Sequence, residues 1–189
     1  MKIILASRSP RRKLLMKKAG IPFRAVTSPV SEKTGLKKPS AIVKNLALKK
    51  AGYAARLHPG APVLGADTIV VCKGKIIGKP SNRAHAMSLL RLQNGSWQAV
   101  YTGVAVVWNK KGKIFSGYRV SRCKARKFSI AGLERLAGKH MDKAGAYAVQ
   151  DGADPFIEKI RGSYDNVVGF PLDLVRELLV KAGCRIKNA

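Results

Sequence analysis

The chain has 189 residues, of which 37 are lysine or arginine and only 10 are aspartate or glutamate, so its net charge is +27 at pH 7. This length predicts one domain, residues 1–189, with a substantial core and room for two lobes. The apolar runs are too short to span a bilayer and the first residues do not resemble a secretory signal, so we expect no membrane partner and a cytoplasmic location.

The first predicted elements are a strand over Lys2–Ala6 and a helix over Pro10–Ala19. Ser9 fits the N-cap of this helix, and Pro10 suits its first position because the proline φ is fixed. Two arginines follow in the first turn, where the helix dipole is already positive. A bound phosphate chain would explain them, whereas the alternative is that both arginines point into water. The residues expected to form this phosphate-binding site are Ser7, Ser9, Arg11 and Arg12.

The remaining patterns alternate between helix and strand before a central hairpin, which predicts an α/β fold with a mixed sheet flanked by helices. A polar loop is expected over Ser28–Pro39. The expected strands are Phe23–Thr27, Pro62–Val71, Lys75–Ile77, Gln98–Trp108, Lys113–Phe128, Ala146–Val149 and Phe156–Ile160. The expected helices are Ser40–Leu57 with Ser40 as cap, Ser81 or Asn82 to Leu92, Ser129–Gly138 with Ser129 as cap, and Pro171–Ala182.

Asp67 lies in an almost wholly apolar strand, where an ionised carboxylate is costly unless it is paired, bound to a metal or placed at the mouth of a cleft. A buried ion pair with a nearby lysine would be a purely structural explanation. A perturbed carboxylate on a strand also often marks a functional site. We favour function, with Asp67 as a ligand for a divalent metal or as a general base for water.

Two further charged residues upstream of Glu134, Lys50 and Glu32, are candidates for the site. Lys50 falls on the apolar face of its helix, so it either extends out of the core or points into a cleft toward phosphate or Asp67. Glu32 is an ordinary loop acid by position. Apart from Asp67, it is the sole carboxylate side chain before Glu134, which favours a chemical role.

Other candidate residues carry weaker signals. Lys79 ends a strand and could place an ammonium group in a pocket, although one lysine among 37 basic residues is weak evidence. Gln150 could bond the edge of a base or could simply face solvent. The three cysteines, Cys72, Cys123 and Cys184, lack metal-type spacing, so free thiols in a reducing compartment are expected.

Several motifs together resemble the Maf-type nucleotide pyrophosphatases. They are Ser7-Arg8-Ser9-Pro10-Arg11-Arg12, Gly65-Ala66-Asp67-Thr68, Gly78-Lys79-Pro80, the run from Asp142 to Gln150 and the run from Gly162 to Pro171. The resemblance extends from Ile3 to about Leu179. It implies an elongated α/β fold like that of inosine triphosphate pyrophosphatases, with a mixed sheet and a cleft between two lobes, and commonly a homodimer.

The resemblance also implies hydrolysis of a nucleoside triphosphate to the monophosphate and pyrophosphate with a divalent cation, Mg²⁺ or Mn²⁺. Asp67 corresponds to the catalytic acid of the family, and Glu32, Lys50 and Lys79 to its other active-site positions. Asp67 and Glu32 are the expected metal ligands. Arg11, Thr68 and Gln150 are similar to the branch that acts on dTTP and UTP, which makes a pyrimidine nucleotide the expected substrate.

Two features depart from the family pattern. The charge of +27 is unusual for it, and Glu32 stands alone where some relatives carry a neighbouring acid, which would lower metal affinity. The basic excess favours a broadly cationic, solvated surface without a specific partner over dedicated nucleic-acid recognition, and predicts weak, salt-sensitive, non-specific binding of nucleic acid. The competing hypothesis is therefore a nucleic-acid-binding protein, or a regulator of cell division and septum formation, without turnover.

Overall fold

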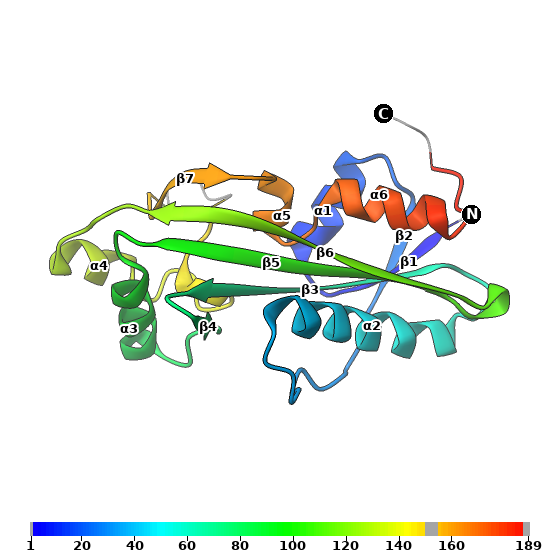
Figure 1. The fold of residues 1–189 in the computed structure, drawn as a ribbon, viewed down its shortest axis with the longest axis horizontal. Coiled ribbons are helices and arrows are strands. Elements are labelled where there is room, and N and C mark those ends of the chain that lie inside the picture. Colours follow the sequence, from blue (N-terminus) through cyan, green and yellow to red (C-terminus); the bar gives the residue numbers. More distant parts are fainter. Residues whose placement is uncertain (1, 150–154, 187–189) are drawn as a thin grey trace. The chain divides into compact units, whose positions relative to one another are not determined.

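The computed structural model describes residues 2–149 and 155–186, which form a mixed α/β structure around a seven-stranded sheet (Figure 1). The strand order is β2-β1-β3-β5-β6-β7, and β4 pairs with β3. The pairs β1/β2 and β1/β3 are parallel, whereas β3/β4 and β6/β7 are antiparallel. The predicted fold class, a mixed sheet flanked by helices, is confirmed.

The strands are β1 (Ile3–Ala6), β2 (Phe23–Val26), β3 (Val63–Cys72), β4 (Lys75–Ile77), β5 (Trp97–Trp108), β6 (Lys113–Ala125) and β7 (Ile157–Arg161). The α-helices are α1 (Pro10–Lys18), α2 (Pro39–Leu57), α3 (Arg83–Gln93), α4 (Ile130–Leu136), α5 (Tyr164–Val168) and α6 (Leu172–Lys181). Two 3₁₀ turns complete the list, η1 (Asn109–Lys111) and η2 (Ala144–Ala146). Among the described residues, no helix is long and apolar enough to cross a membrane.

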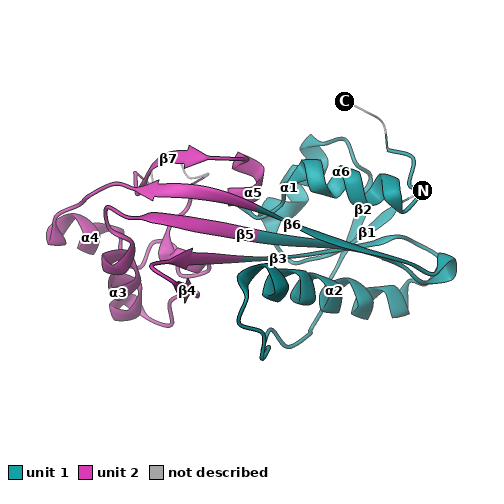
Figure 2. Ribbon diagram, viewed as in Figure 1, with its two compact units in different colours: residues 1–68, 102–119, 168–189 teal, residues 69–101, 120–167 magenta. Residues whose placement is uncertain are grey.

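The chain divides into two compact units (Figure 2). Unit 1 comprises residues 1–68, 102–119 and 168–189, and unit 2 comprises residues 69–101 and 120–167. The boundaries fall inside β3, β5 and β6, so each of these strands contributes residues to both units. The cleft expected from the family resemblance stays a prediction.

Unit 1 buries both faces of its part of the sheet, and the alternation along β1 shows how. Ile3 and Leu5 pack with residues of α1 and α6, whereas Ile4 and Ala6 pack with the alanines of α2. Successive side chains of a strand point to opposite faces, so a near-continuous apolar strand is buried on both sides. Burying these side chains is the main stabilising term of the unit.

Unit 2 has two smaller cores. One joins α3 and α4 to Tyr147 and Phe156, and the other joins Val100 and Cys123 to the apolar side of α3. All three cysteines are buried free thiols, as the sequence predicted.

Three details correct the sequence analysis. The strand expected over residues 146–149 is wrong, because Gly145 and Ala146 adopt positive φ angles of 87° and 60° that no strand accommodates. The apolar residues in this segment are buried in a turn rather than in a strand. The N-cap of α2 is Lys38 rather than Ser40, which is buried in the first turn behind Pro39. Helix α5 was not predicted.

Candidate active site

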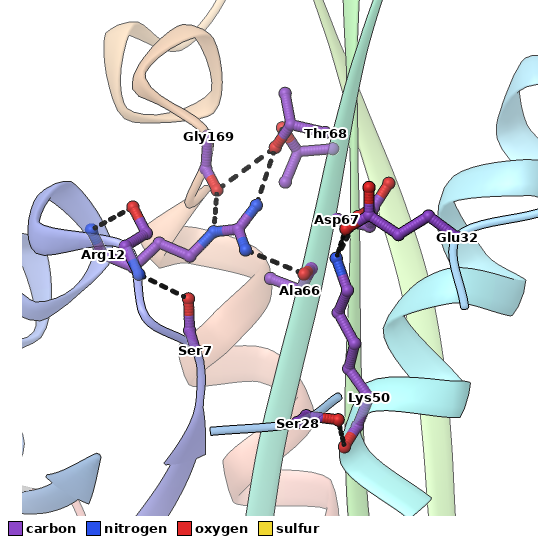
Figure 3. Close-up of polar contacts among 11 residues, drawn as sticks. Ser7, Arg12, Ser28, Glu32, Lys50, Ala66, Asp67, Thr68 and Gly169 are labelled. Atoms are coloured by element: carbon purple, nitrogen blue, oxygen red, sulfur yellow. Dashed lines mark hydrogen bonds and ion pairs between the residues drawn. The ribbon is translucent and has the colours of Figure 1, made fainter. Parts of the chain in front are cut away.

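Asp67 lies on β3 just beyond the point where that strand loses its parallel neighbour. The β1/β3 pairing ends at Leu5 and Leu64, and β1 itself stops at Ala6. The side chain of Asp67 is 9% exposed and faces α2, on the same side of the strand as Gly65 (Figure 3). Asp67 is therefore a nearly buried carboxylate on a part of β3 that is no longer paired with β1.

Lys50 of α2 is the partner of this carboxylate. Its Nζ lies 2.5 Å from Oδ1 of Asp67 and 2.7 Å from Oε1 of Glu32, so one ammonium group bridges two acids (Figure 3). The Lys50 side chain is 13% exposed and that of Glu32 is 61% exposed. Of the two orientations open to Lys50 from its sequence, the structure shows the one directed at Asp67. Three of the four residues expected at the catalytic centre, Asp67, Glu32 and Lys50, are thus brought together within unit 1.

Two opposing effects act on the pKa of Asp67. Burial raises its pKa above the usual 3.8, because a desolvated carboxylate is disfavoured in its charged form, and this effect is the larger. The Lys50 ammonium and, more weakly, Arg12 lower the pKa in opposition. A carboxylate with a raised pKa is a better proton acceptor than one in water.

The loop that carries Glu32 is held against α2 by two hydrogen bonds. The Ser28 hydroxyl donates to the Lys50 carbonyl at 3.2 Å, and the Lys49 ammonium donates to the Lys33 carbonyl at 3.3 Å. The polar loop predicted from the sequence is confirmed, since β2 ends at Val26 and α2 begins at Pro39. These contacts explain how a loop acid comes to share a lysine with a buried strand acid.

Two glycines allow α2 to approach the sheet closely enough for Lys50 to reach Asp67. A Cβ built on Gly65 of β3 would lie 2.4 Å from the Ala47 carbonyl oxygen. A Cβ on Gly103 of β5 would lie 2.3 Å from the carbonyl of Val43. Backbone of the helix therefore packs directly on backbone of the sheet, and any side chain there would push the helix outward.

We expect Gly65→Ala to lower the free energy of unfolding by about 1–3 kcal/mol, because α2 must shift to accept the methyl group. The same shift lengthens the contact between Lys50 and Asp67, so turnover should fall as well. Urea unfolding and steady-state rates would measure both effects.

Gly52→Ala is the matched control on the other side of α2, where a built Cβ meets nothing within 4 Å. It should leave turnover unchanged and raise stability by about 0.5–1 kcal/mol through helix propensity. Equal stability of the Gly65→Ala variant and the wild type would contradict the packing argument.

The start of α1 follows the sequence prediction closely. Ser9 is the N-cap, with its hydroxyl accepting from the Arg12 N–H at 3.4 Å, and Pro10 is the first helical residue. The Ser7 hydroxyl accepts from the Ser9 N–H at 3.2 Å, and Ser7 is buried. Arg11 is half-buried in the first turn. This turn is not neutralised by any acid of its own.

Arg12 makes contacts that the sequence did not indicate. Its Nε donates to the Gly169 carbonyl at 3.0 Å, its Nη1 to the Ala66 carbonyl at 2.8 Å and its Nη2 to the Thr68 hydroxyl at 3.1 Å. The guanidinium group thus fills the edge of β3 that β1 leaves unpaired (Figure 3). Burial lowers the pKa of the Arg12 guanidinium, and the nearby Asp67 opposes that shift. Arg12 ties α1, β3 and the Gly169 turn together beside Asp67.

The Thr68 hydroxyl is the centre of a small polar network on the opposite face of β3 from Asp67. Its Oγ1 lies 3.0 Å from Oγ1 of Thr102 and 3.4 Å from the Gly169 carbonyl. Thr102 and Gly169 were not singled out in the sequence. A buried threonine within the apolar strand β5 was the available signal for Thr102, and Gly169, with φ of 102°, sits in the Gly162–Pro171 motif.

The roles predicted for Lys79 and Gln150 stay predictions. Lys79 follows β4 in unit 2 and is exposed, and its role beside Asp67 stays a prediction. Gln150 lies outside the described residues.

The donor set suits a hard divalent cation. Asp67 and Glu32 offer carboxylate oxygens around a common point, the Lys50 ammonium. Within residues 2–149 and 155–186, no group of three or more histidine, cysteine, aspartate or glutamate side chains could hold a metal ion. Mg²⁺ is typically bound through one or two carboxylates with substrate phosphates and water, so Asp67 and Glu32 are the residues that could hold it, and the metal site stays a prediction.

The model of the family described as Maf-like protein matches residues 2–182. The chain belongs to the Maf family. The Maf resemblance recognised in the sequence motifs is thereby confirmed over nearly the whole chain. One relative, named dTTP/UTP pyrophosphatase, from Elusimicrobium minutum (strain Pei191), is 51% identical over 97% of this chain and 100% of its own length.

A second relative carries the same name as the first. A dTTP/UTP pyrophosphatase from Bacillus mycoides (strain KBAB4) is 45% identical over 94% of both chains. Among solved structures, a HAM1 protein from Coxiella burnetii is 15% identical to this Maf protein, with a TM-score of 0.47 over 66% of this chain and 73% of that one.

Proposed function

We propose that this Maf protein is a nucleoside triphosphate pyrophosphatase that hydrolyses dTTP and UTP to the monophosphate and pyrophosphate. The observation that carries the proposal is the nearly buried Asp67, held by Lys50 together with Glu32 beside the cationic first turn of α1. The names and high identity of the relatives support the choice of reaction and of nucleotides.

In the proposed reaction, a water oxygen attacks the α-phosphorus, the bond from that phosphorus to the bridging oxygen breaks, and pyrophosphate leaves. The Asp67 carboxylate accepts the water proton, and its raised pKa suits it for this task. Lys50 keeps the carboxylate oriented and offsets negative charge that develops on the phosphate oxygens.

The triphosphate tail is proposed to lie at the start of α1. Ser7, Ser9 and the half-buried Arg11 surround the positive end of that helix, and Lys79 would add a further cation. Arg12 already donates three hydrogen bonds to the chain, so its principal contribution is to hold the α1 turn against β3. Its charge still favours an anion nearby.

Asp67 and Glu32 would hold the divalent cation, Mg²⁺ or Mn²⁺. When bound, such a cation lowers the pKa of water and offsets phosphate charge. Thr68 and Gln150 are proposed to favour the pyrimidine base, Thr68 through the network that fixes its hydroxyl. A site built to hydrogen-bond one base leaves polar groups unpaired with another, which penalises the wrong base.

A panel of dTTP, UTP, dCTP, dATP and dGTP, assayed with and without Mn²⁺, tests this function. Pyrophosphate should be released from dTTP and UTP in preference to purine nucleotides, and only with the cation. In H₂¹⁸O, the label should enter the monophosphate, because attack occurs at the α-phosphorus. Release of single phosphate groups, label in pyrophosphate or a preference for purines would contradict the proposal.

A further inference from the structure

Unit 2 carries a sheet face that combines several cations with an exposed aromatic ring. Along β6 and β7, Cys123 and Ile160 pair and point into the core that contains Val100. The residues between them in the alternation therefore lie on the opposite face. We call this set the outer cationic face, and it consists of Trp97, Arg122, Lys124, Lys159 and Arg161.

Like charges stand directly opposite each other on this face. In the β6/β7 register, Arg122 pairs with Arg161 and Lys124 pairs with Lys159. Like charges in directly opposed positions destabilise a sheet. Two such pairs in succession favour an anionic partner, because the repulsion is relieved when phosphate groups lie between the cations.

Carboxylates do not provide that relief within residues 2–149 and 155–186, where no ion pair includes any of the four cations. Lys124 donates to the Gly95 carbonyl at 2.7 Å, and Arg161 stacks over the Trp97 ring at 4.8 Å. The acid nearest along the strands is Glu158, the extra residue at the irregularity between Lys124 and Ala125. The face therefore remains strongly positive.

The aromatic ring decides which polyanion fits. Trp97 is 37% exposed at the start of β5, and Tyr101, half-buried, follows at a spacing that places it on the same face of the strand. Bases of a single strand stack on aromatic rings and on guanidinium planes, while lysine and arginine bind the phosphates. A duplex hides its bases and offers phosphates alone. The combination of stacked Trp97 and Arg161 with flanking cations is suited to unpaired bases.

We propose that the outer cationic face binds single-stranded nucleic acid, with bases on Trp97 and Arg161 and phosphates on Arg122 and Lys159. This site is separate in sequence from the Asp67 centre, and its cations belong to none of the catalytic or phosphate-binding positions. The net charge of +27 favours binding of polyanions, and the outer cationic face would be one site for that binding.

Fluorescence anisotropy with a labelled oligothymidylate of about 16 nucleotides tests the proposal. The double variant Arg122→Gln/Lys159→Gln should reduce the slope of log affinity against log salt by about 1.4, since each single-strand phosphate contact contributes roughly 0.7. The control Lys75→Gln/Lys110→Gln removes the same charge from exposed positions elsewhere and should leave the slope unchanged. Equal losses in both variants would overturn the proposal by showing only diffuse attraction.

Stacking has its own readout. Binding should quench the fluorescence of Trp97, which can be assigned because the other tryptophan, Trp108, is 5% exposed. Trp97→Ala should weaken binding by roughly tenfold, and Trp97→Phe should restore most of it. Tighter binding of a duplex of the same length, or dependence on this face for phosphatidylserine vesicles but not for the oligonucleotide, would contradict it. All these variants should keep wild-type hydrolysis of dTTP, which separates this test from that of the enzyme.

Discussion

Asp67→Asn is expected to lower kcat by about 10²–10⁴-fold, the range that a positioned general base contributes. The variant should still fold and unfold cooperatively, because asparagine is nearly isosteric and Lys50 keeps Glu32 as an ion-pair partner. The asparagine oxygen can still accept a hydrogen bond from Lys50, and the desolvation cost of a nearly buried charge disappears. Pyrophosphate release would check the effect on kcat, and thermal unfolding of the same preparation would check the effect on the fold.

Asp173→Asn is the matched control for this substitution. Asp173 is an acid of unit 1 whose side chain is 57% exposed and pairs with Arg119 on the surface. Its loss should leave kcat unchanged, because exposed ion pairs contribute little and its ion-pair partner Arg119 lies outside the proposed site. Pyrophosphate release near the wild-type rate by the Asp67→Asn variant would remove Asp67 from the proposed chemistry.

Lys50→Met is expected to lower the free energy of unfolding by about 3 kcal/mol at pH 7, because it leaves the Asp67 carboxylate nearly buried without its main partner. Turnover should be lost as well. Urea unfolding compared with Lys44→Met, a half-buried lysine of the same helix, isolates the effect of the contact with Asp67.

The deficit of the Lys50→Met variant should depend on pH. Removing the ammonium group raises the Asp67 pKa further above its unfolded value, so the folded state binds the proton more tightly than the unfolded state. The lost stability should therefore be recovered as the pH falls through that raised pKa. Adding Asp67→Asn to Lys50→Met should recover it at pH 7 too. A deficit equal to that of Lys44→Met would show that the ion pair contributes nothing.

The sequence was sufficient to predict the elements that follow strong local rules. Ser9 and Pro10 define the start of α1, and Ser129 and Asn82 cap their helices as side-chain acceptors. Asp67 was conspicuous because an acid interrupts an apolar strand, and Lys50 because a lysine interrupts an apolar helix face. Two misplaced charges compensate each other, which is why both signals pointed to one site.

Contacts between distant segments could not be predicted in the same way. Arg12 meets Gly169 and Thr68 because β1 stops early and leaves the β3 edge open, a consequence of register rather than of local pattern. The closeness of α2 to the sheet depends on Gly65 and Gly103, whose importance appears only when helix and sheet are packed. The turn at Gly145 was mistaken for a strand because burial of its neighbours imitates a strand pattern.

The most direct test of the central claim is a crystal structure with α,β-imido-dUTP, whose α–β linkage resists hydrolysis, and Mg²⁺. The account places the α-phosphate beside Asp67 and Lys50, with the outer phosphates at the first turn of α1 near Ser7 and Arg11. A nucleotide bound elsewhere, with its α-phosphate remote from Asp67, would contradict it.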